Sequence, residues 1–399
     1  MSQRYQGGIL GVGFNPLQAP NAPTIGTATA GGNNCASVTF TAPANVGGSA
    51  ITGYTARSDP TGYSGAAAGS PISVTGLTTS TSYTFGVFAL NTYGPSPQSA
   101  FSNSITAVLD GTFGIFALGK TSSCCLITTR NKYTYSGDVV STGGAATAAS
   151  QRGSAAGNST VGIFALGNTG VNVIARDKYT YVGCVVSAGG SATAASSYSS
   201  AAGNSTVGIF ALGCTGSGSV TRNKYTYAGC VVSAGATATT ASSRGSATGN
   251  STVGIFALGF ASCSTRVTTR NKYTYSGDVV STGGAATAAS SSGSATGNST
   301  VGIFALGIIS GVGSTTRDKY TYSGDVVAAG GAATAATFAG SAAGNSTVGI
   351  FAIGEASSGG VITRDKYTYS GCVVSAGGAA TTASSAGSAA SNGIAGITL

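Results

Sequence analysis

Residues 157–190 read GNSTVGIFALGNTGVNVIARDKYTYVGCVVSAGG, and this sequence pattern recurs along most of the 399-residue chain. The motif G-I-F-A-[LI]-G begins six times, at spacings of 48, 46, 46, 48 and 47 residues, and a degenerate seventh start follows at Gly396. A fixed period of this kind predicts a repeat architecture. The six motifs begin at Gly114, Gly162, Gly208, Gly254, Gly302 and Gly349.

Each unit predicts four short strands. The run Val161–Leu166 is apolar throughout, as expected for a strand covered on both faces. The segment Arg130–Tyr135 alternates Arg, Lys and Thr with Asn and Tyr, and Val139–Ser141 is β-branched. The small residues near Ala145–Ala156 suit an innermost strand, where neighbouring units crowd together.

This period with four strands fits one blade of a β-propeller. We therefore expect an all-β protein in which residues 110–399 form a six-bladed β-propeller with four strands per blade. The first copy lacks its own innermost strand, and Ser384–Leu399 repeats that strand. We expect this C-terminal segment to complete blade one and close the ring.

The unit also resembles a divergent kelch repeat, over residues 111–399. G-I-F-A-L-G stands where that family has an apolar strand ending in a Gly doublet. K-Y-T-Y-S-G-D-V-V stands where the family has a Tyr followed six residues later by Trp, although the residue six after Tyr133 is Val139 here. The resemblance implies a kelch-like propeller.

All eight prolines lie between Pro16 and Pro97, which predicts a domain boundary near residue 109. Residues 20–109 contain short alternating runs between turn residues, which is typical of a β-sandwich. The stretch resembles a fibronectin type III domain: Phe40 stands where that family has a core Trp, and Leu77 with Tyr83 looks like its tyrosine corner. The resemblance implies a spacer or a binding platform. It also rests on Pro23, Ile51–Tyr54, Phe85, Val87, Ala89, Asn91, Gly94 and Ser99.

Residues 1–19 form a Gly-rich N-terminal arm with an apolar run at Gly7–Phe14. We expect this run to add a strand to the sheet edge of a neighbouring subunit, and a frayed terminus is the alternative. The arm lacks the long apolar core of a secretory signal, and no apolar run is long enough to predict membrane insertion.

The charge composition excludes several classes of function. Only 27 residues are charged, and histidine is absent, which excludes a catalytic triad and His-ligated metals. Asp138, Asp278 and Asp325 occupy equivalent positions in different copies, so no carboxylate pair for acid–base catalysis is predicted. The net charge of +9 is spread evenly, and no nucleic-acid module is present. We expect no enzyme, no cofactor and no nucleic-acid partner.

Sequence variation between the copies is confined largely to two places. One is the stretch after each G-I-F-A-[LI]-G motif, and the other is a single position before the small-residue strand. Loops that vary on a fixed scaffold are how binding faces are built, and drift in unconstrained loops is the alternative. The candidate binding residues are Lys120, Asn168, Phe260, Arg266, Ile308, Glu355, Arg152, Tyr198 and Arg244.

Every copy also carries one R-x-K pair, and together these pairs form a predicted basic ring. Identity in every copy favours a structural role between blades, and attraction of an acidic polysaccharide or cell surface is the alternative. The pairs are Arg130 and Lys132, Arg176 and Lys178, Arg222 and Lys224, Arg270 and Lys272, Arg317 and Lys319, and Arg364 and Lys366.

Cysteines replace the Asp of S-G-D in three copies, and each is followed by a copy with cysteine in its variable stretch. This order suggests disulfides between blades, whereas the opposite ends of a blade are too far apart to bridge. Pairs on one face, such as Cys214 with Cys263, and free thiols stay open. The candidates are Cys124, Cys125, Cys184, Cys214, Cys230, Cys263 and Cys372.

Repeats of this wording, joined to a fibronectin-like domain and a Gly-rich arm, also resemble structural proteins of tailed bacteriophages. We therefore expect a non-catalytic protein at the virion surface, a tail fibre or adhesin that presents propeller loops to a host glycan or protein. Its arm would bind other virion proteins, and the chain would be a homo-oligomer. The alternatives are a capsid-decoration or other architectural virion protein, and an intracellular kelch-type binding scaffold.

Overall fold

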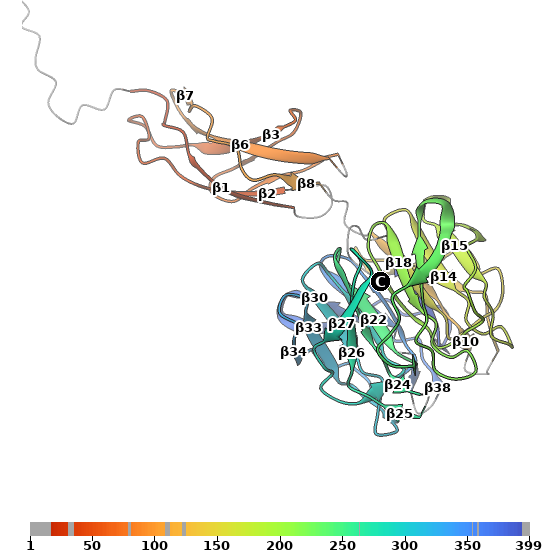
Figure 1. The fold of residues 1–399 in the computed structure, drawn as a ribbon. Helices are drawn as coiled ribbons and strands as arrows, with labels where there is room; N and C mark the ends of the chain where they lie inside the picture. The colour runs from red at the N-terminus through yellow and green to blue at the C-terminus, as the bar shows by residue number, and fades with distance from the viewer. Residues whose placement is uncertain are drawn as a thin grey trace, which may run out of the picture. The chain divides into compact units, whose positions relative to one another are not determined.

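The computed structural model describes residues 17–30, 36–78, 81–107, 112–121, 125–262, 264–352, 354–356 and 359–392. Over these residues the chain is all-β, with three short 3-10 turns (Figure 1). It divides into two compact units, Met1–Leu109 and Asp110–Leu399, called here the first and the second unit. In the described part of the chain, no helix has the length and apolar character needed to cross a bilayer.

The first unit contains two antiparallel sheets. One has the strand order β1-β2-β5, and the other has the order β4-β3-β6-β7, with β8 also pairing with β6. The strands are β1 (Thr24–Ala30), β2 (Ala36–Thr41), β3 (Gly53–Asp59), β4 (Ser64–Ala67), β5 (Ile72–Val74), β6 (Ser82–Asn91), β7 (Gly94–Pro95) and β8 (Ile105–Thr106).

Both sheets of the first unit contribute to one core. Val38 and Phe40 come from β2, Tyr54 comes from β3 and Val87 comes from β6, and all four are buried. The ring centroids of Phe40 and Tyr54 lie 4.5 Å apart. The apolar positions alternate along each strand because successive side chains point to opposite faces of a sheet.

Three buried serines help to cover one edge of β6. Each serine Oγ accepts a hydrogen bond from a β6 N–H, and each serine N–H donates to the carbonyl of the same β6 residue. Their spacing of three differs from the spacing of two in a regular ladder, and the side chains supply the missing bonds. The pairs are Ser96 with Ala89, Ser99 with Val87, and Ser102 with Phe85.

The second unit contains six four-stranded antiparallel sheets, named here repeat sheets 1 to 6. From the inner to the outer strand they are as follows: sheet 1, β42 (Ser388–Ser391), β9 (Phe113–Ala117), β11 (Arg130–Thr134) and β12 (Val139–Thr142); sheet 2, β13 (Ser154–Gly157), β14 (Val161–Ala165), β15 (Arg176–Thr180) and β16 (Val185–Ala188); sheet 3, β17 (Ser200–Gly203), β18 (Val207–Ala211), β19 (Arg222–Thr226) and β20 (Val231–Gly235); sheet 4, β22 (Ser246–Gly249), β23 (Val253–Ala257), β26 (Arg270–Thr274) and β27 (Val279–Gly283); sheet 5, β29 (Ser294–Gly297), β30 (Val301–Ala305), β33 (Arg317–Thr321) and β34 (Val326–Ala329); sheet 6, β35 (Ser341–Gly344), β36 (Val348–Ala352), β39 (Arg364–Thr368) and β40 (Val373–Ala376).

Shorter elements lie between the strands of the repeat sheets. Three 3-10 turns precede outer strands: η1 (Val182–Cys184), η2 (Ala228–Cys230) and η3 (Ser370–Cys372). Two-residue strands form in or beside the variable stretches, which the sequence did not predict: β10 (Lys120–Thr121), β21 (Ser242–Ser243), β24 (Phe260–Ala261), β25 (Thr265–Arg266), β28 (Ser290–Ser291), β31 (Ile308–Ile309), β32 (Val312–Gly313), β37 (Glu355–Ala356), β38 (Gly359–Gly360) and β41 (Ser384–Ser385).

Each repeat sheet packs face to face on its neighbours. Ile163 of β14 packs with Phe210 of repeat sheet 3, whereas the adjacent Phe164 packs with Ile115 of repeat sheet 1. Successive side chains of one strand therefore enter two different cores. This accounts for the unbroken apolar run of the G-I-F-A-[LI]-G motif.

The glycine of this motif leaves room for a neighbouring inner strand. A Cβ built on Gly208 would lie 3.1 Å from the Cβ of Ala156 in repeat sheet 2 and 2.9 Å from the hydroxyl of Tyr227. Such contacts are closer than ordinary packing distances. A larger residue at this position would push the two sheets apart.

Repeat sheet 6 packs on repeat sheet 1 in the same way, with Ile350 against Phe116. β42 pairs with β9, so the C-terminal strand is the inner strand of the first sheet. Asn392 Oδ1 accepts hydrogen bonds from the N–H groups of Thr112 at 2.8 Å and Phe113 at 2.9 Å. Each repeat sheet thus packs on two neighbours, because the last sheet in the sequence contacts the first.

The inner strand is shorter than the predicted segment Ala145–Ala156, since β13 begins at Ser154. The residues before β13 instead form backbone hydrogen bonds with β11 and with the residues just before β11. Gly143 N–H donates to the Arg130 carbonyl at 2.8 Å, and Ala146 N–H donates to the Thr128 carbonyl at 2.8 Å.

Candidate functional site

Six buried arginines join each repeat sheet to the next. Arg130 Nη2 donates to Asp177 Oδ2 at 2.7 Å, and its Cζ lies 4.6 Å from the centre of the Phe164 ring. Arg130 Nη1 also donates to the Gly144 carbonyl at 3.4 Å. We call this set the arginine contact. It recurs at Arg130, Arg176, Arg222, Arg270, Arg317 and Arg364.

The acceptor of the arginine contact is aspartate in three copies and asparagine in the other three. A threonine hydroxyl forms a hydrogen bond with either acceptor residue, because a hydroxyl can donate to an aspartate oxygen or accept from an asparagine N–H. Thr147 Oγ1 donates to Asp177 at 2.5 Å, whereas Asn223 Nδ2 donates to Thr193 Oγ1 at 2.8 Å. The pairs are Arg130–Asp177, Arg270–Asp318 and Arg317–Asp365 with aspartate, and Arg176–Asn223, Arg222–Asn271 and Arg364–Asn131 with asparagine.

The environment of these arginines excludes them from a binding surface. Burial lowers the pKa of Arg176, Arg222 and Arg364 to about 10, so they remain charged at neutral pH. Burial also lowers the pKa of Arg130, and Asp177 opposes that shift. Because their side chains are inaccessible, the idea that the arginines of the basic ring attract an acidic polysaccharide is wrong.

The lysines of the R-x-K pairs lie nearer the surface. Three form ion pairs with an Asp of the next sheet: Lys224–Asp278 at 2.8 Å, Lys272–Asp325 at 3.0 Å and Lys366–Asp138 at 3.0 Å. Partial burial opposes ionisation of Asp278, but hydrogen bonds from Lys224 and Tyr273 lower its pKa overall. Lys132 Nζ lies 4.1 Å from the centre of the Phe113 ring. Lys178 and Lys319 have no carboxylate partner among the described residues.

Cysteines occupy the Asp position in the other three copies. Cys184, Cys230 and Cys372 are half-buried and pack against the clusters that contain Tyr179, Tyr225 and Tyr367. These three cysteines and Cys214 are free thiols. A blade-to-blade disulfide between Cys184 and Cys214 is therefore wrong: Cys184 precedes the outer strand, whereas Cys214 begins the stretch at the other end of β18. Cys124, Cys263 and residues 1–16 of the N-terminal arm lie outside the described residues.

Six backbone hydrogen bonds link the single variable positions to one another, and we call these positions the bridging residues. The N–H of each bridging residue donates to the carbonyl of the one before it, at 2.7–3.1 Å, and Arg152 donates to Ala386. All six have a positive φ between 51° and 58°, which is costly for L residues and persists only where the surroundings enforce it. The bridging residues are Arg152, Tyr198, Arg244, Ser292, Ala339 and Ala386.

The variable stretches lie beside the bridging residues. The residue before each bridging residue pairs with the first residue of a variable stretch, as Gln151 does with Asn168 and Ser243 with Phe260. Strands β10, β24, β25 and β38 of these stretches lie toward the lower side of the second unit in Figure 1. Both sets of variable positions thus form one end of the unit, called here the variable end. Its candidate residues also include Lys120, Ile308 and Glu355.

Positive and aromatic side chains alternate across part of the variable end. The Cζ atoms of Arg152 and Arg244 lie 4.6 Å and 4.4 Å from the centre of the Tyr198 ring. The Cζ atoms of Arg244 and Arg266 lie 5.4 Å and 4.9 Å from the centre of the Phe260 ring. We call these five half-buried residues the arginine–aromatic array. It spans repeat sheets 2, 3 and 4.

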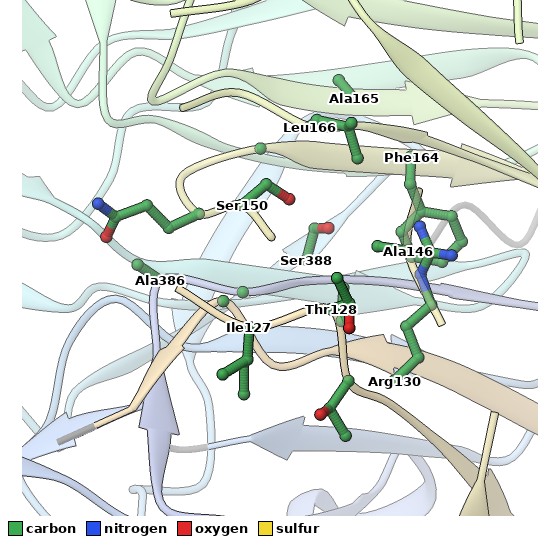
Figure 2. A pocket seen from close by; sticks show the side chains of 16 residues that line it. Ile127, Thr128, Arg130, Ala146, Ser150, Phe164, Ala165, Leu166, Ala386 and Ser388 are labelled. Carbon is green, nitrogen blue, oxygen red and sulfur yellow. The ribbon is translucent and has the colours of Figure 1, made fainter. Parts of the chain in front are cut away.

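The crevices between sheets at the variable end are small. The one between repeat sheets 1 and 2 has a free volume of about 10 Å³, and Figure 2 shows Arg130 beside Phe164 at its edge, with Ser150 and Ser388 nearby. Similar crevices of about 20 Å³ lie between sheets 5 and 6 and between sheets 6 and 1. Each has room for about one water molecule rather than a substrate.

No metal centre is evident in the described part of the second unit or the first. Groups of three or more His, Cys, Asp or Glu residues that can hold a metal ion are absent among the described residues. Asp177, Asp318 and Asp365 are engaged by the arginine contacts. The groups that the variable end presents among the described residues include guanidiniums, aromatic rings and backbone N–H and C=O groups.

Exchange of the acceptor tests the arginine contact. Asp177→Asn recreates the arrangement of Arg176 with Asn223, whereas Asp177→Leu leaves Arg130 buried without its carboxylate. We expect Asp177→Leu to lower the free energy of unfolding by about 3–5 kcal/mol, and Asp177→Asn to lower it clearly less. Urea unfolding followed by circular dichroism measures both. Equal losses in the two variants would contradict this role of the acceptor.

The buried tyrosines predict alkaline unfolding of the second unit. Burial raises the pKa of Tyr179 and Tyr225 to about 12, and burial raises the pKa of Tyr181 and Tyr275 well above 10. These buried tyrosines ionise near pH 10 in the unfolded chain but not in the folded chain, so their contribution to stability is full below about pH 10 and falls as the pH rises beyond it. Tyrosinate absorbance at 295 nm should rise together with the loss of circular dichroism above about pH 10. Ionisation of these tyrosines in a chain that stays folded would contradict this expectation.

No protein-family model matches the chain, and no curated protein matches it. Among solved structures, the chain is similar to a crystal structure of domains from titin, at 28% identity and a TM-score of 0.21. The similarity covers 23% of this chain, and this chain spans only 32% of that one.

Proposed function

We propose that the second unit is a six-bladed β-propeller of kelch-like type and that the chain is a non-catalytic recognition protein. The observation that carries this proposal is the clustering of both variable sets at one end of a constant frame. Backbone hydrogen bonds hold the bridging residues, so their side chains are free to differ. Variation on a rigid scaffold is how proteins build binding faces.

The constant parts of the repeat support the absence of catalysis in this proposal. Asp138, Asp278 and Asp325 pair with lysines of neighbouring sheets, and their tyrosine contacts fix them further. The crevices at the variable end hold about one water molecule each. Neither feature offers a reactive group beside a space for substrate.

We further propose that the protein is exposed on the surface of a tailed-bacteriophage virion and binds the host surface. This step follows the resemblance of the repeats, the first unit and the Gly-rich arm to structural proteins of such viruses. The first unit, which resembles a fibronectin type III domain, would act as a spacer. The N-terminal arm would bind other virion proteins.

A variant with a uniform variable end tests recognition. It carries the Asn168–Ala175 stretch in all six copies and alanine at every bridging position, as Ala339 and Ala386 already are. We expect retention on bacterial cells to fall about tenfold or more relative to the parent chain. The melting temperature should change by only a few degrees, because the arginine contacts are intact.

The full-length parent chain, labelled with a fluorophore and incubated with a panel of bacterial cells, is the control. Equal retention of parent and variant would contradict recognition by the variable end. Retention of neither protein on any strain would favour a purely architectural virion protein and would also contradict the proposal.

A further inference from the structure

The arginine–aromatic array concentrates positive charge without nearby acid. Arg152, Arg244 and Arg266 are its three cations, and repeat sheets 2, 3 and 4 place no Asp or Glu in their variable stretches. The acid of the variable end is Glu355, whose Oε2 lies 3.6 Å from Lys120 Nζ and accepts a hydrogen bond from Ser385 Oγ. Glu355 thus interacts with Lys120 and Ser385, and it does not neutralise the positive charge of the array.

The aromatic rings of the array order the guanidinium groups. Tyr198 follows Arg152 and precedes Arg244 in the cyclic order of the bridging residues, and both guanidiniums lie over its ring. Phe260 likewise lies between Arg244 and Arg266. Cation–π contacts of this kind restrict a flexible arginine, so less entropy is lost when its N–H groups bind an anion.

These contacts also decide against stacking as the mode of recognition. Proteins that bind single-stranded nucleic acids offer free aromatic faces to successive bases, whereas the rings here are occupied by guanidiniums. The donors left for a ligand are guanidinium N–H groups other than Arg266 Nε, which donates to Ser291 Oγ at 3.0 Å, and Arg244 Nη2, which donates to the Tyr198 hydroxyl at 3.5 Å. The planar fork of a guanidinium matches a carboxylate, which accepts two parallel hydrogen bonds.

We propose that the arginine–aromatic array binds an acidic polysaccharide through the carboxylates of successive sugars. The inference rests on the proposed recognition function and names the ligand class of the variable end. A polymer fits better than a small anion because the three arginines come from different variable positions, Arg152 at repeat sheet 2 and both Arg244 and Arg266 at repeat sheet 4, with Tyr198 of repeat sheet 3 between them. Several weak carboxylate contacts along one chain add to a useful affinity.

The chain supplies its own matched substitution. Arg152→Ala with Arg244→Ala places alanine where Ala339 and Ala386 stand in other copies, at the same positive φ. Ser292 and these alanines show that the backbone hydrogen bonds do not need the arginine side chain. The double variant should therefore fold normally, which its melting temperature verifies.

Binding of the full chain to polygalacturonate, measured by biolayer interferometry at two salt concentrations, tests the proposal. We expect the double variant to lose about tenfold or more in affinity, and neutral dextran to show no binding to either protein. The control is Lys178→Gln with Lys319→Gln, which removes the same charge elsewhere on the repeat sheets. We expect this control to change the affinity by no more than about twofold.

Four results would overturn the inference, three of them in the binding assays and the fourth on cells. The first is no binding of the parent to polygalacturonate, and the second is an equal loss in the lysine control, which would indicate general charge attraction. The third is equally tight, arginine-dependent binding of a single-stranded DNA oligonucleotide, which would favour nucleic acid. Cell retention separates this inference from the proposed function. Equal retention of parent and Arg152→Ala/Arg244→Ala on cells would overturn the ligand class but leave recognition by other loops standing.

Discussion

The arginine contact is the interaction on which the second unit depends. A guanidinium at the start of each third strand reaches the next sheet, where it meets Asp or Asn and a phenylalanine ring, and it also donates to the carbonyl of the residue 14 positions later in the chain. Burying a charge is favourable only where such partners are supplied together. The contact therefore fixes the distance and the angle between neighbouring sheets, and it does so with a weakly charged sequence.

The arginine contact repeats between every pair of neighbouring sheets, so the frame is held without the side chains of the variable end. Arg364 of repeat sheet 6 donates to Asn131 of repeat sheet 1, across 233 positions of sequence, as Arg222 does to Asn271 across 49. The bridging residues add a second set of sheet-to-sheet bonds that uses only backbone groups. Because neither set uses the side chains of the variable end, those side chains can differ without loss of the frame.

The sequence predicted the repeat, its apolar strand and the small-residue inner strand, because each leaves a periodic pattern. It did not predict the partner of Arg130, because Asp177 lies 47 residues away and only the packing of two sheets brings them together. The positive φ of Arg152 was hidden for a similar reason, since local preference favours Gly or Asn there. The sequence did not predict the arginine–aromatic array, because its contacts join bridging residues of different copies, such as Arg152 and Tyr198. Its residues had been candidates singly, as members of variable loops.

Substitution of equivalent arginines tests the central claim most directly, that the last sheet contacts the first through the same interaction as every other pair. Arg222→Met and Arg364→Met remove contacts of the same kind, both with an asparagine acceptor at 3.0 Å. Urea unfolding of the full chain should show similar losses for both, of about 1–3 kcal/mol in the free energy of unfolding, because each substitution takes a hydrogen bond from a buried amide oxygen. A chain that is unaffected by Arg364→Met but strongly destabilised by Arg222→Met would contradict the account.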